Sequence, residues 1–403
     1  MSAGAVLGRA ARAGERTLSL ARPRVAGALL AQLDGVERSD HEQLDATLEW
    51  LARAQDATGV GGVAARYDLA SGWDRAYPET TGYIIGTMLH AADVTCRPEL
   101  ADRAVRMGEW LLEIQQPAGW IPGGLARDGG GRPEVFNTGQ VLFGWLALHE
   151  VTGREDFAAA GARAAQWLAA VQAGDGSWVE ASLHGEAHAY YSRVTWALAR
   201  AGVVLNDRTF VDAATASIEW VCGQQRDGGW IDHMSFTEGA PALTHTIAYT
   251  IEGLLECALV LGHERAWSVA AQAMRSLAAT YTDPGAPGRC ARTGGLIATF
   301  TDGFVPADTD YECVTGSAQA ALCARRLDAL GGRPEHAEFA DTLTEAVKRA
   351  QSQRGPAGVR GGVPGSNPIW GAYGSFKYLN WAAKFVADLL LDRVAGLPRA
   401  RYG

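Results

Sequence analysis

The chain has 403 residues, of which 47% are hydrophobic, and its formal net charge is −9. This apolar content is ample for a large core. Charges of both signs are scattered along the chain, without the basic stripe that nucleic-acid binding requires. Composition therefore argues against a nucleic-acid partner.

The first thirty residues are rich in Ala and Arg, and arginines interrupt each of their apolar runs. They lack the apolar region of a secretory signal, and the chain has no stretch of about 18 uncharged apolar residues to span a membrane. The six cysteines are scattered without CxxC pairs, which is typical of reduced thiols rather than of a zinc ribbon. We expect a cytoplasmic protein with no membrane partner, in which residues 1–40 form a helical extension.

Helical periodicity recurs along the chain in paired runs. Trp followed by an apolar residue marks the first run of four successive pairs, at Trp50, Trp110, Trp167 and Trp220, a spacing of roughly 55 residues. This spacing is too long for the common two-helix solenoids and suits helical hairpins with elaborated loops. Since repeats can hold such a length in one domain, we predict six hairpins in a single unit. Their expected ranges are 41–92, 100–151, 156–204, 209–262, 265–331 and 336–393.

The second run of each predicted hairpin begins with a polar cluster. In 76–86, Pro78 suits a first helical turn, and Glu79 beside it places an anion where the helix dipole favours one. Long loops with Gly and Trp precede these starts, and long loops in compact domains are usually functional. If the hairpins close into a ring, the starts face one basin, where we expect the substrate site. Comparable starts lie at 137–140, 190–193, 243–246, 312–316 and 378–381.

Two loops share a Gln-x3-Gly-x-Trp motif, at 172–178 and 224–230, and 115–120 is a shortened copy. The motif resembles the QW repeat of squalene–hopene cyclases and their relatives, in which Gln and Trp tie neighbouring helices together. This resemblance implies an α/α toroid and a structural role for these residues, rather than terpene chemistry.

Four longer segments resemble six-hairpin toroid proteins that are associated with polysaccharide enzymes. They are 77–83 (YPETTGY), 136–145 (FNTGQVLFGW), 243–250 (LTHTIAYT) and 368–385, where PIWG is followed by NWAAKF. The resemblance implies an all-α fold, an (α/α)6 barrel like that of many glycoside hydrolases, polysaccharide lyases and sugar epimerases. It does not single out a reaction, because one fold hosts many chemistries. We expect 41–394 to form the catalytic barrel and 395–403 a C-terminal tail.

Polar and aromatic residues are interleaved at the predicted helix starts and loops, in greater number than a core holds without a ligand or dense hydrogen bonding. This combination suits a small-molecule or oligosaccharide substrate. We expect no cofactor and no metal, since no phosphate-binding glycine loop, dinucleotide fingerprint or Gly-x-Ser-x-Gly elbow is present. The candidate substrate-binding residues are Trp73, Asp74, Tyr83, His188, Tyr191, Tyr249, Trp370, Tyr373, Lys377, Tyr378 and Asn380.

The first interpretation of the site is uronate chemistry, by a lyase or an epimerase. Removing the proton beside a uronate carboxylate requires a neutralised carboxylate, a base and an acid. Asn137, His245 and Arg193 are candidates to neutralise the carboxylate. Tyr190 or Tyr191 could transfer the proton. These residue types are similar to those of α/α polysaccharide lyases, although each also has an ordinary structural explanation.

The second interpretation is glycoside hydrolysis, which requires two carboxyl groups on either side of the scissile bond, one of them with a raised pKa. Glu79 and one of the acids near 310 come from opposite parts of the predicted ring and form the best pair. Those acids are Asp308, Asp310 and Glu312.

A third interpretation is a terpene-cyclase-like cyclase or isomerase with Asp308 and Asp310 as the acid. The segment 308–311 resembles the Asp-x-Asp-Asp proton donor of class II cyclases, but its last position is Tyr311. A variant of this idea places zinc on Asp310, Cys313 and His245, without the ligand spacing of the protein prenyltransferases.

A fourth interpretation is a ring that binds glycans without catalysis. It predicts that Glu79→Gln and Tyr190→Phe leave function intact.

Overall fold

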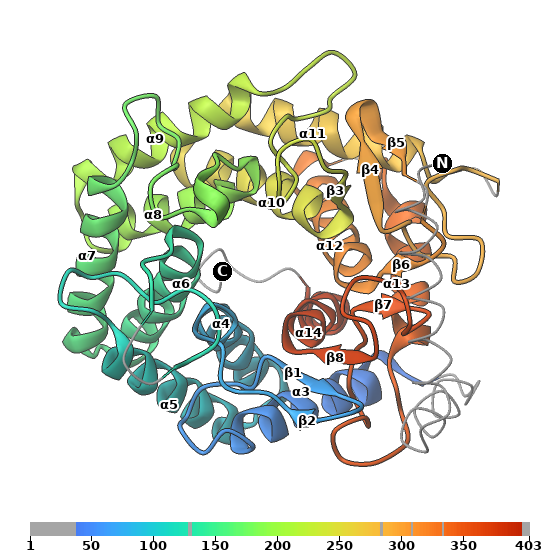
Figure 1. The fold of residues 1–403 in the computed structure, drawn as a ribbon, viewed down its shortest axis with the longest axis horizontal. Coiled ribbons are helices and arrows are strands. Elements are labelled where there is room, and N and C mark those ends of the chain that lie inside the picture. Colours follow the sequence, from blue (N-terminus) through green and yellow to red (C-terminus); the bar gives the residue numbers. More distant parts are fainter. Residues whose placement is uncertain (1–37, 128–130, 283–284, 308, 333, 397–403) are drawn as a thin grey trace, which may run out of the picture.

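The computed structural model describes residues 38–396, apart from 128–130, 283–284, 308 and 333. In these residues, helices alternate along the chain between an outer and an inner ring (Figure 1). Each inner helix contacts the next, and α14 contacts α4, so the ring is closed. The outer helices are α3 (Asp40–Asp56), α5 (Pro98–Ile114), α7 (Glu155–Ala170), α9 (Arg208–Gly223), α11 (Glu264–Ala279) and α13 (Ala337–Ala350). The inner helices are α4 (Pro78–Thr95), α6 (Val135–Thr152), α8 (Ser192–Val204), α10 (Thr244–Leu261), α12 (Val314–Gly331) and α14 (Asn380–Ala395).

The predicted (α/α)6 barrel is therefore confirmed, and the six predicted hairpins match the six outer–inner pairs closely. The expected helical extension at 1–40 and the expected tail at 395–403 lie almost wholly outside the described residues. Ser39 caps α3, because its hydroxyl accepts from the backbone of Glu42 while the Glu42 carboxylate accepts from the backbone of Ser39.

Short turns link successive hairpins on one face of the ring. The inner helices α6, α10 and α12 end at Gly153, Gly262 and Gly332, whose φ angles are 69°, 66° and 67°. Glycine adopts this left-handed conformation without a Cβ penalty, so the chain turns at once into the next outer helix.

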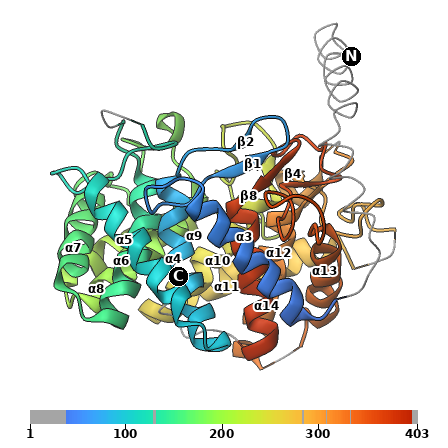
Figure 2. The ribbon, with the colours of Figure 1, turned by 90° about the horizontal axis from the view of Figure 1, so that it is seen from below.

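The long loops gather on the opposite face, where the inner helices begin (Figure 2). Short strands that the sequence did not predict join these loops. They form three small sheets because the loops of neighbouring hairpins run side by side. The strands are β1 (Arg66–Asp68), β2 (Gly72–Trp73) and β8 (Lys377–Leu379) in one sheet, β3 (Ala242–Leu243), β4 (Thr299–Thr301) and β5 (Val305–Pro306) in the second, and β6 (Glu312–Cys313) with β7 (Ser366–Asn367) in the third. The pairing of β1 with β8 links the first hairpin to the last.

Glycines allow the inner helices to approach one another closely. A Cβ on Gly82 would lie 2.5 Å from the Cα of Val141, and one on Gly144 would lie 2.5 Å from the carbonyl oxygen of Gly82. A methyl group at either position would separate α4 from α6. The glycines of the recurring polar starts thus serve packing of the ring.

Glutamines tie the outer ring together, which is the structural role that the motif analysis predicts. Their Nε2 atoms donate to carbonyl oxygens of the next outer helix, and Gln351 closes the circle onto α3. One correction concerns the motif at 224–230, where Gln225 rather than Gln224 forms the bond to the next helix, while Gln224 bonds to Trp220 of its own helix. The bonds are Gln55 to Arg103 (3.1 Å), Gln115 to Ala160 (2.9 Å), Gln172 to Ala213 (3.0 Å), Gln225 to Val269 (3.1 Å) and Gln351 to Gln43 (3.0 Å).

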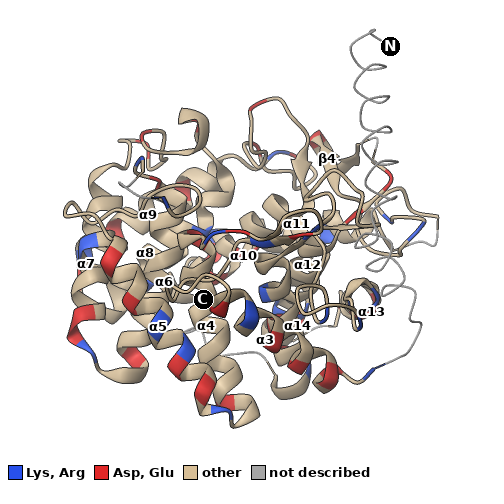
Figure 3. Ribbon diagram, turned by 60° about the horizontal axis from the view of Figure 1, so that its bottom comes forward, with Lys and Arg blue, Asp and Glu red and all other residues tan. Residues whose placement is uncertain are grey.

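Charges of both signs are interspersed over the helices (Figure 3). Among the described residues, no helix combines the length and the apolar character needed to cross a membrane. All six cysteines are free, and Cys96 is the exposed one.

Candidate active site

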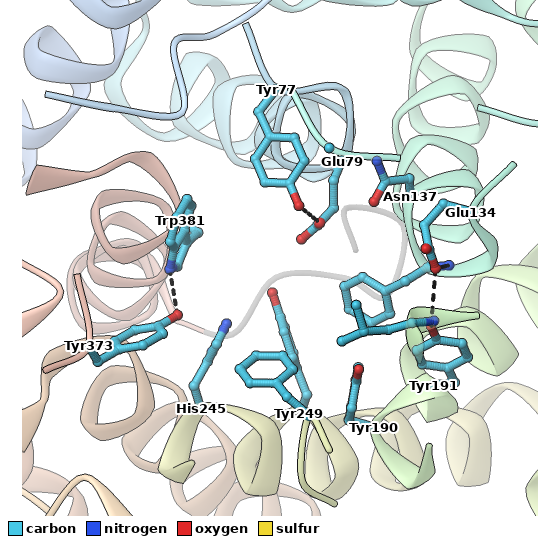
Figure 4. A pocket seen from close by; sticks show the side chains of 14 residues that line it. Tyr77, Glu79, Glu134, Asn137, Tyr190, Tyr191, His245, Tyr249, Tyr373 and Trp381 are labelled. Carbon is cyan, nitrogen blue, oxygen red and sulfur yellow. Dashed lines mark hydrogen bonds between the residues drawn. The ribbon is translucent and has the colours of Figure 1, made fainter. Parts of the chain in front are cut away.

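A cavity of about 360 Å³ lies where the inner helices begin, at the centre of the loop face (Figure 4). Its side chains come from the starts of five of the six inner helices, all but α12, and from the loops above them. Most are aromatic, and two are carboxylic acids. The lining residues are Tyr77, Glu79, Gly124, Glu134, Phe136, Asn137, Leu183, Tyr190, Tyr191, Phe236, His245, Tyr249, Tyr373 and Trp381.

Glu79 enters the cavity from the first turn of α4. Pro78 begins the helix, and the preceding residue, Tyr77, has extended backbone at the N-cap. The Tyr77 hydroxyl donates a hydrogen bond to Oε2 of Glu79. Among the described residues, none forms a hydrogen bond to Oε1 of Glu79, so this oxygen remains available to a ligand.

Glu134 enters the cavity from the start of α6, as the N-cap residue of that helix. Its Oε1 accepts hydrogen bonds from the Phe136 backbone at 3.4 Å and from the Tyr191 hydroxyl at 3.1 Å. In the described part of the chain, Oε2 of Glu134 has no hydrogen-bond partner. Figure 4 shows both carboxyl groups directed toward the cavity from neighbouring inner helices.

The two carboxyl groups share an unusual electrostatic environment. Burial raises the pKa of Glu79 to about 7; the bond from Tyr77 and the charge of Arg193 act in the opposite direction, and the charge of Glu134 adds to the rise. Burial likewise raises the pKa of Glu134 to about 7 against the bonds from Phe136 and Tyr191. Both acids can therefore exchange protons near neutral pH, which is the property of catalytic carboxyls.

His245 forms the opposite wall, on α10. Burial lowers the pKa of His245 to about 4, so the imidazole is neutral at neutral pH. Its Nδ1 lies 2.5 Å from Oε1 of Gln319 on α12. The ring lies 4.2 Å from that of Tyr249, and burial raises the pKa of the Tyr249 hydroxyl.

The remaining walls are mostly aromatic, and hydrogen bonds and ring contacts hold their side chains in place. Trp381 donates from Nε1 to the Tyr373 hydroxyl at 2.8 Å, and Asn137 donates from Nδ2 to the carbonyl oxygen of Pro122 at 2.8 Å. Phe136 lies 5.5 Å from the rings of both Tyr190 and Tyr249. Rings held in this way are rigid surfaces for a ligand.

The structure brings together seven of the residues singled out from the sequence. They come from four inner-helix starts and one loop, as the closed ring requires. These residues are Glu79, Asn137, Tyr190, Tyr191, His245, Tyr249 and Tyr373.

Arg193, expected to neutralise a uronate, does not line the cavity. It is fully buried, and its Nη1 donates to Oε2 of Glu252 at 2.5 Å while Nε donates to Oε1 of Gln140 at 3.1 Å. Its guanidinium lies 4.9 Å from the centre of the Tyr249 ring, which is part of the cavity wall. Arg193 thus acts on the site through its charge and its neighbours.

The acids expected near 310 do not face the cavity either. Glu312 is fully buried on β6 against Gly295, with Oε2 accepting from Asn367 at 3.5 Å. Asp310 is exposed, and Asp308 lies outside the described residues. The second carboxyl group in the cavity is therefore that of Glu134, and not that of an acid near 310.

Several expected substrate-binding residues have structural contacts instead. Asp74 pairs with Arg66 at 2.8 Å, and Lys377 lies 3.6 Å from Asp68. The others that do not line the cavity are packed or hydrogen-bonded within the loops and the ring: Trp73 against Trp50, Tyr83 against Phe385, His188 between the carbonyl oxygens of Leu183 and Ser235, Trp370 against the core, Tyr378 with Ser352, and Asn380 with Thr80.

Sequence reasoning missed Tyr77, Glu134 and Trp381 as cavity residues. The N-cap residue type carries no signal for Tyr77 and Glu134, because none of the six inner helices has Ser, Thr, Asp or Asn as its N-cap residue. The described residues include no group of three His, Cys, Asp or Glu side chains placed to hold a metal ion, so zinc on Asp310, Cys313 and His245 gains no support.

No family model matches the chain, and no curated protein sequence matches it. Solved structures with the same architecture do match. An unsaturated glucuronyl hydrolase from Bacillus sp. GL1 aligns with a TM-score of 0.68 and 16% identity, over 89% of this chain and 98% of that one. A cellobiose 2-epimerase from Bacillus thermoamylovorans aligns with a TM-score of 0.67 and 10% identity, over 88% and 98%. A polysaccharide lyase aligns with a TM-score of 0.61 and 12% identity, over 89% and 98%. At these identities the likeness shows the shared (α/α)6 fold, and the reaction has to be argued from the cavity.

Proposed function

We propose that this chain is a carbohydrate-active enzyme that cleaves a glycosidic bond by proton transfer, with Glu79 and Glu134 as its carboxyl pair. The observation that carries the proposal is the placement of both carboxyls in one aromatic cavity, each with a pKa near 7. Near neutral pH, a pair with one protonated and one ionised member is well populated, and that is the state that acid–base cleavage requires.

Shape and surroundings support a sugar as the substrate. The cavity is of the size of a small-molecule site, and its tyrosines, phenylalanines and tryptophan offer flat apolar surfaces beside hydrogen-bonding groups. The three structural relatives named above are a glucuronyl hydrolase, a cellobiose epimerase and a polysaccharide lyase, which agrees with this substrate class.

The charges of the cavity favour a neutral sugar ring at the point of reaction. Among the described lining residues there is no Lys or Arg, and Arg193, which does not line the cavity, is paired with Glu252. A uronate carboxylate placed beside Glu79 and Glu134 would lack the cation that neutralises it. Hydrolysis therefore moves ahead of uronate lyase or epimerase chemistry.

In the proposed reaction the protonated member of the pair donates to the glycosidic oxygen, and the ionised member activates the attacking water or stabilises the positive charge at the anomeric carbon. Glu79 is assigned the acid, because its bond from Tyr77 leaves Oε1 free to carry the proton. Glu134 is assigned the base, because its two bonds stabilise the ionised form.

Epimerisation or elimination is the second candidate, favoured by a different observation. His245, Tyr190 and Tyr249 stand opposite the carboxyls, so a proton acceptor and hydroxyl donors face the acids across the substrate space (Figure 4). Such opposed groups suit removal and return of a proton at carbon.

Incubation of the purified chain with neutral and uronate-containing oligosaccharides tests these alternatives. New reducing ends without ultraviolet absorbance from a new conjugated double bond would support hydrolysis, and a bell-shaped pH profile centred near pH 7 is expected from the pair. A new conjugated double bond would indicate a lyase, and deuterium uptake from solvent without cleavage would indicate an epimerase. Binding without any turnover would overturn the proposal in favour of a glycan-binding ring.

A further inference from the structure

An ion pair between two inner helices lies beside Tyr249 of the cavity wall. Arg193 of α8 is fully buried, and its Nη1 lies 2.5 Å from Oε2 of Glu252 on α10. Burying a guanidinium costs several kcal/mol of hydration unless an opposite charge is close to it. Glu252, whose side chain is 16% exposed, supplies that charge and is itself connected to a cavity residue.

One amide side chain connects the ion pair to a residue of the cavity wall. Gln319 of α12 donates from Nε2 to Oε2 of Glu252 at 3.5 Å, and its Oε1 faces Nδ1 of His245 at 2.5 Å. Oε2 of Glu252 accepts the hydrogen bond from the Arg193 guanidinium, and a carboxylate oxygen only accepts, so the amide nitrogen of Gln319 has to face it. The carbonyl oxygen of Gln319 is then left for His245, and a carbonyl oxygen only accepts. Nδ1 of His245 must therefore carry the proton.

We propose that Arg193, Glu252 and Gln319 form a positioning relay that fixes neutral His245 as the Nδ1–H tautomer and presents an unprotonated Nε2 to the cavity. Among the described residues, none forms a hydrogen bond to Nε2, and the ring of His245 points into the cavity in Figure 4. An unprotonated Nε2 accepts a hydrogen bond from a substrate hydroxyl, or takes a proton from it. The opposite tautomer would present a donor there and repel the same hydroxyl hydrogen.

The relay links three inner helices, α8, α10 and α12, so it also fixes the direction of the imidazole ring. A base oriented by a third group is the arrangement of a catalytic triad, in which loss of the orienting group costs rate by yielding the wrong tautomer. The tautomer itself stands independently of the function proposed above, whereas its use on a sugar hydroxyl rests on that function.

Nitrogen-15 NMR of histidine-labelled protein tests the tautomer in the resting state. The chain has nine histidines, and a His245→Gln variant assigns the signals of His245 by their loss. We expect long-range proton–nitrogen spectra in which Nδ1 of His245 has a protonated-type shift and Nε2 an unprotonated-type shift. The opposite pattern, or an equal mixture of the two tautomers, would overturn the relay. This result is obtained without any variant of the relay itself.

Two isosteric variants then test the relay. Gln319→Met removes the amide between Glu252 and His245, and we expect a mixture of tautomers and a roughly tenfold lower kcat with a smaller change in KM. Gln140→Met is the matched control, because Gln140 is an equally buried glutamine that accepts from Nε of Arg193 at 3.1 Å but does not lie on the path to His245. It should keep the single tautomer and most of the kcat.

An unchanged tautomer in Gln319→Met would overturn the relay, as would an equal loss of the tautomer in Gln140→Met. A single Nδ1–H tautomer in a protein that turns over no glycan would uphold the relay and overturn the function proposed above. The relay and the proposed function can therefore be disproved independently of each other.

Discussion

Glu79 and Glu312 are both carboxylic acids at the start of an inner helix, and they have opposite surroundings. Glu79 is the second residue of α4 and faces the cavity beside the Tyr77 hydroxyl. Glu312 precedes α12 by two residues, is fully buried, and lies so close to Gly295 that a Cβ there would sit 2.0 Å from its carboxyl group. Burial raises the pKa of each. A raised pKa at a helix start is therefore not enough to identify a catalytic acid.

The difference arises from the position of each residue relative to its helix. Glu312 pairs with Ile297 in an isolated backbone bridge two residues before its helix, and Ala76 and Pro133 form the corresponding bridges before α4 and α6. None of Glu312, Ala76 and Pro133 lines the cavity. Glu79 in the first turn of α4 and Glu134 at the N-cap of α6 do line it, so the place of each acid relative to its helix distinguishes them from Glu312.

The largest effect that this comparison predicts is on turnover. Glu79→Gln removes the proposed acid and should lower kcat/KM about 10³-fold, because general acid catalysis is lost while shape is kept. Glu312→Gln should leave kcat/KM within about twofold, since its carboxyl does not reach the cavity. Parallel assays on the glycan that the wild type cleaves best measure both. Equal losses in the two variants would mean that Glu312 is catalytic after all.

The second expected effect is on the pH dependence of the free energy of unfolding, and it has the same direction for Glu79 and Glu312. The pKa of Glu79 rises from 4.5 in the unfolded chain to about 7 in the folded one, so the folded chain holds the proton more firmly. This contribution is present below about pH 4.5 and is lost as the pH rises through about 7, and at roughly 1.36 kcal/mol per pKa unit it amounts to at most about 3 kcal/mol. Glu79→Gln, which is always neutral, should lose less unfolding free energy than the wild type over this range.

Glu312→Gln should show the same direction of change, because burial raises the pKa of Glu312 as well. Urea unfolding at several pH values measures both variants. A wild-type free energy of unfolding that rises across this interval in step with the titration of Glu79 would contradict the assignment. Glu79 and Glu312 should therefore affect the pH dependence of stability in the same direction, but only Glu79 should affect turnover.

The fold was predictable because its signals are local and repeated. Tryptophans recur roughly every 55 residues, at Trp50, Trp110, Trp167 and Trp220, and this spacing indicates the hairpins. Glycines at the short turns indicate where the hairpins end. The sheets of the loop face were not predictable, because a two-residue strand such as β6 (Glu312–Cys313) carries no periodicity and pairs with a segment more than fifty residues away.

The site was predictable in part, for the same reason. Glu79, Asn137 and His245 lie inside the first turns of their helices, and helical geometry in a closed ring brings first turns together. Arg193 is likewise the second residue of its helix, α8, yet it does not line the cavity and donates to Glu252 instead, so its place in the helix start did not reveal its contacts. Thr-Gly pairs at 81–82, 138–139 and 315–316 look equivalent in the sequence, but α12 begins nearer to its pair than α4 and α6 do to theirs.

The smallest expected effects distinguish two loop tyrosines, of which one lines the cavity and the other does not. Tyr373 lines the cavity and accepts a hydrogen bond from Trp381 at 2.8 Å, whereas Tyr378 is fully buried and pairs with Ser352 at 2.8 Å. Tyr373→Phe should raise KM several-fold, about 1 kcal/mol, because the ring loses the bond that orients it toward the ligand. Tyr378→Phe should instead lower the free energy of unfolding by about 1 kcal/mol and leave KM unchanged, because it breaks a buried bond outside the cavity. Steady-state kinetics and urea unfolding on the same preparations decide the matter, since a rise in KM for Tyr378→Phe equal to that for Tyr373→Phe would place the substrate over β8 rather than at the mouth of the inner ring.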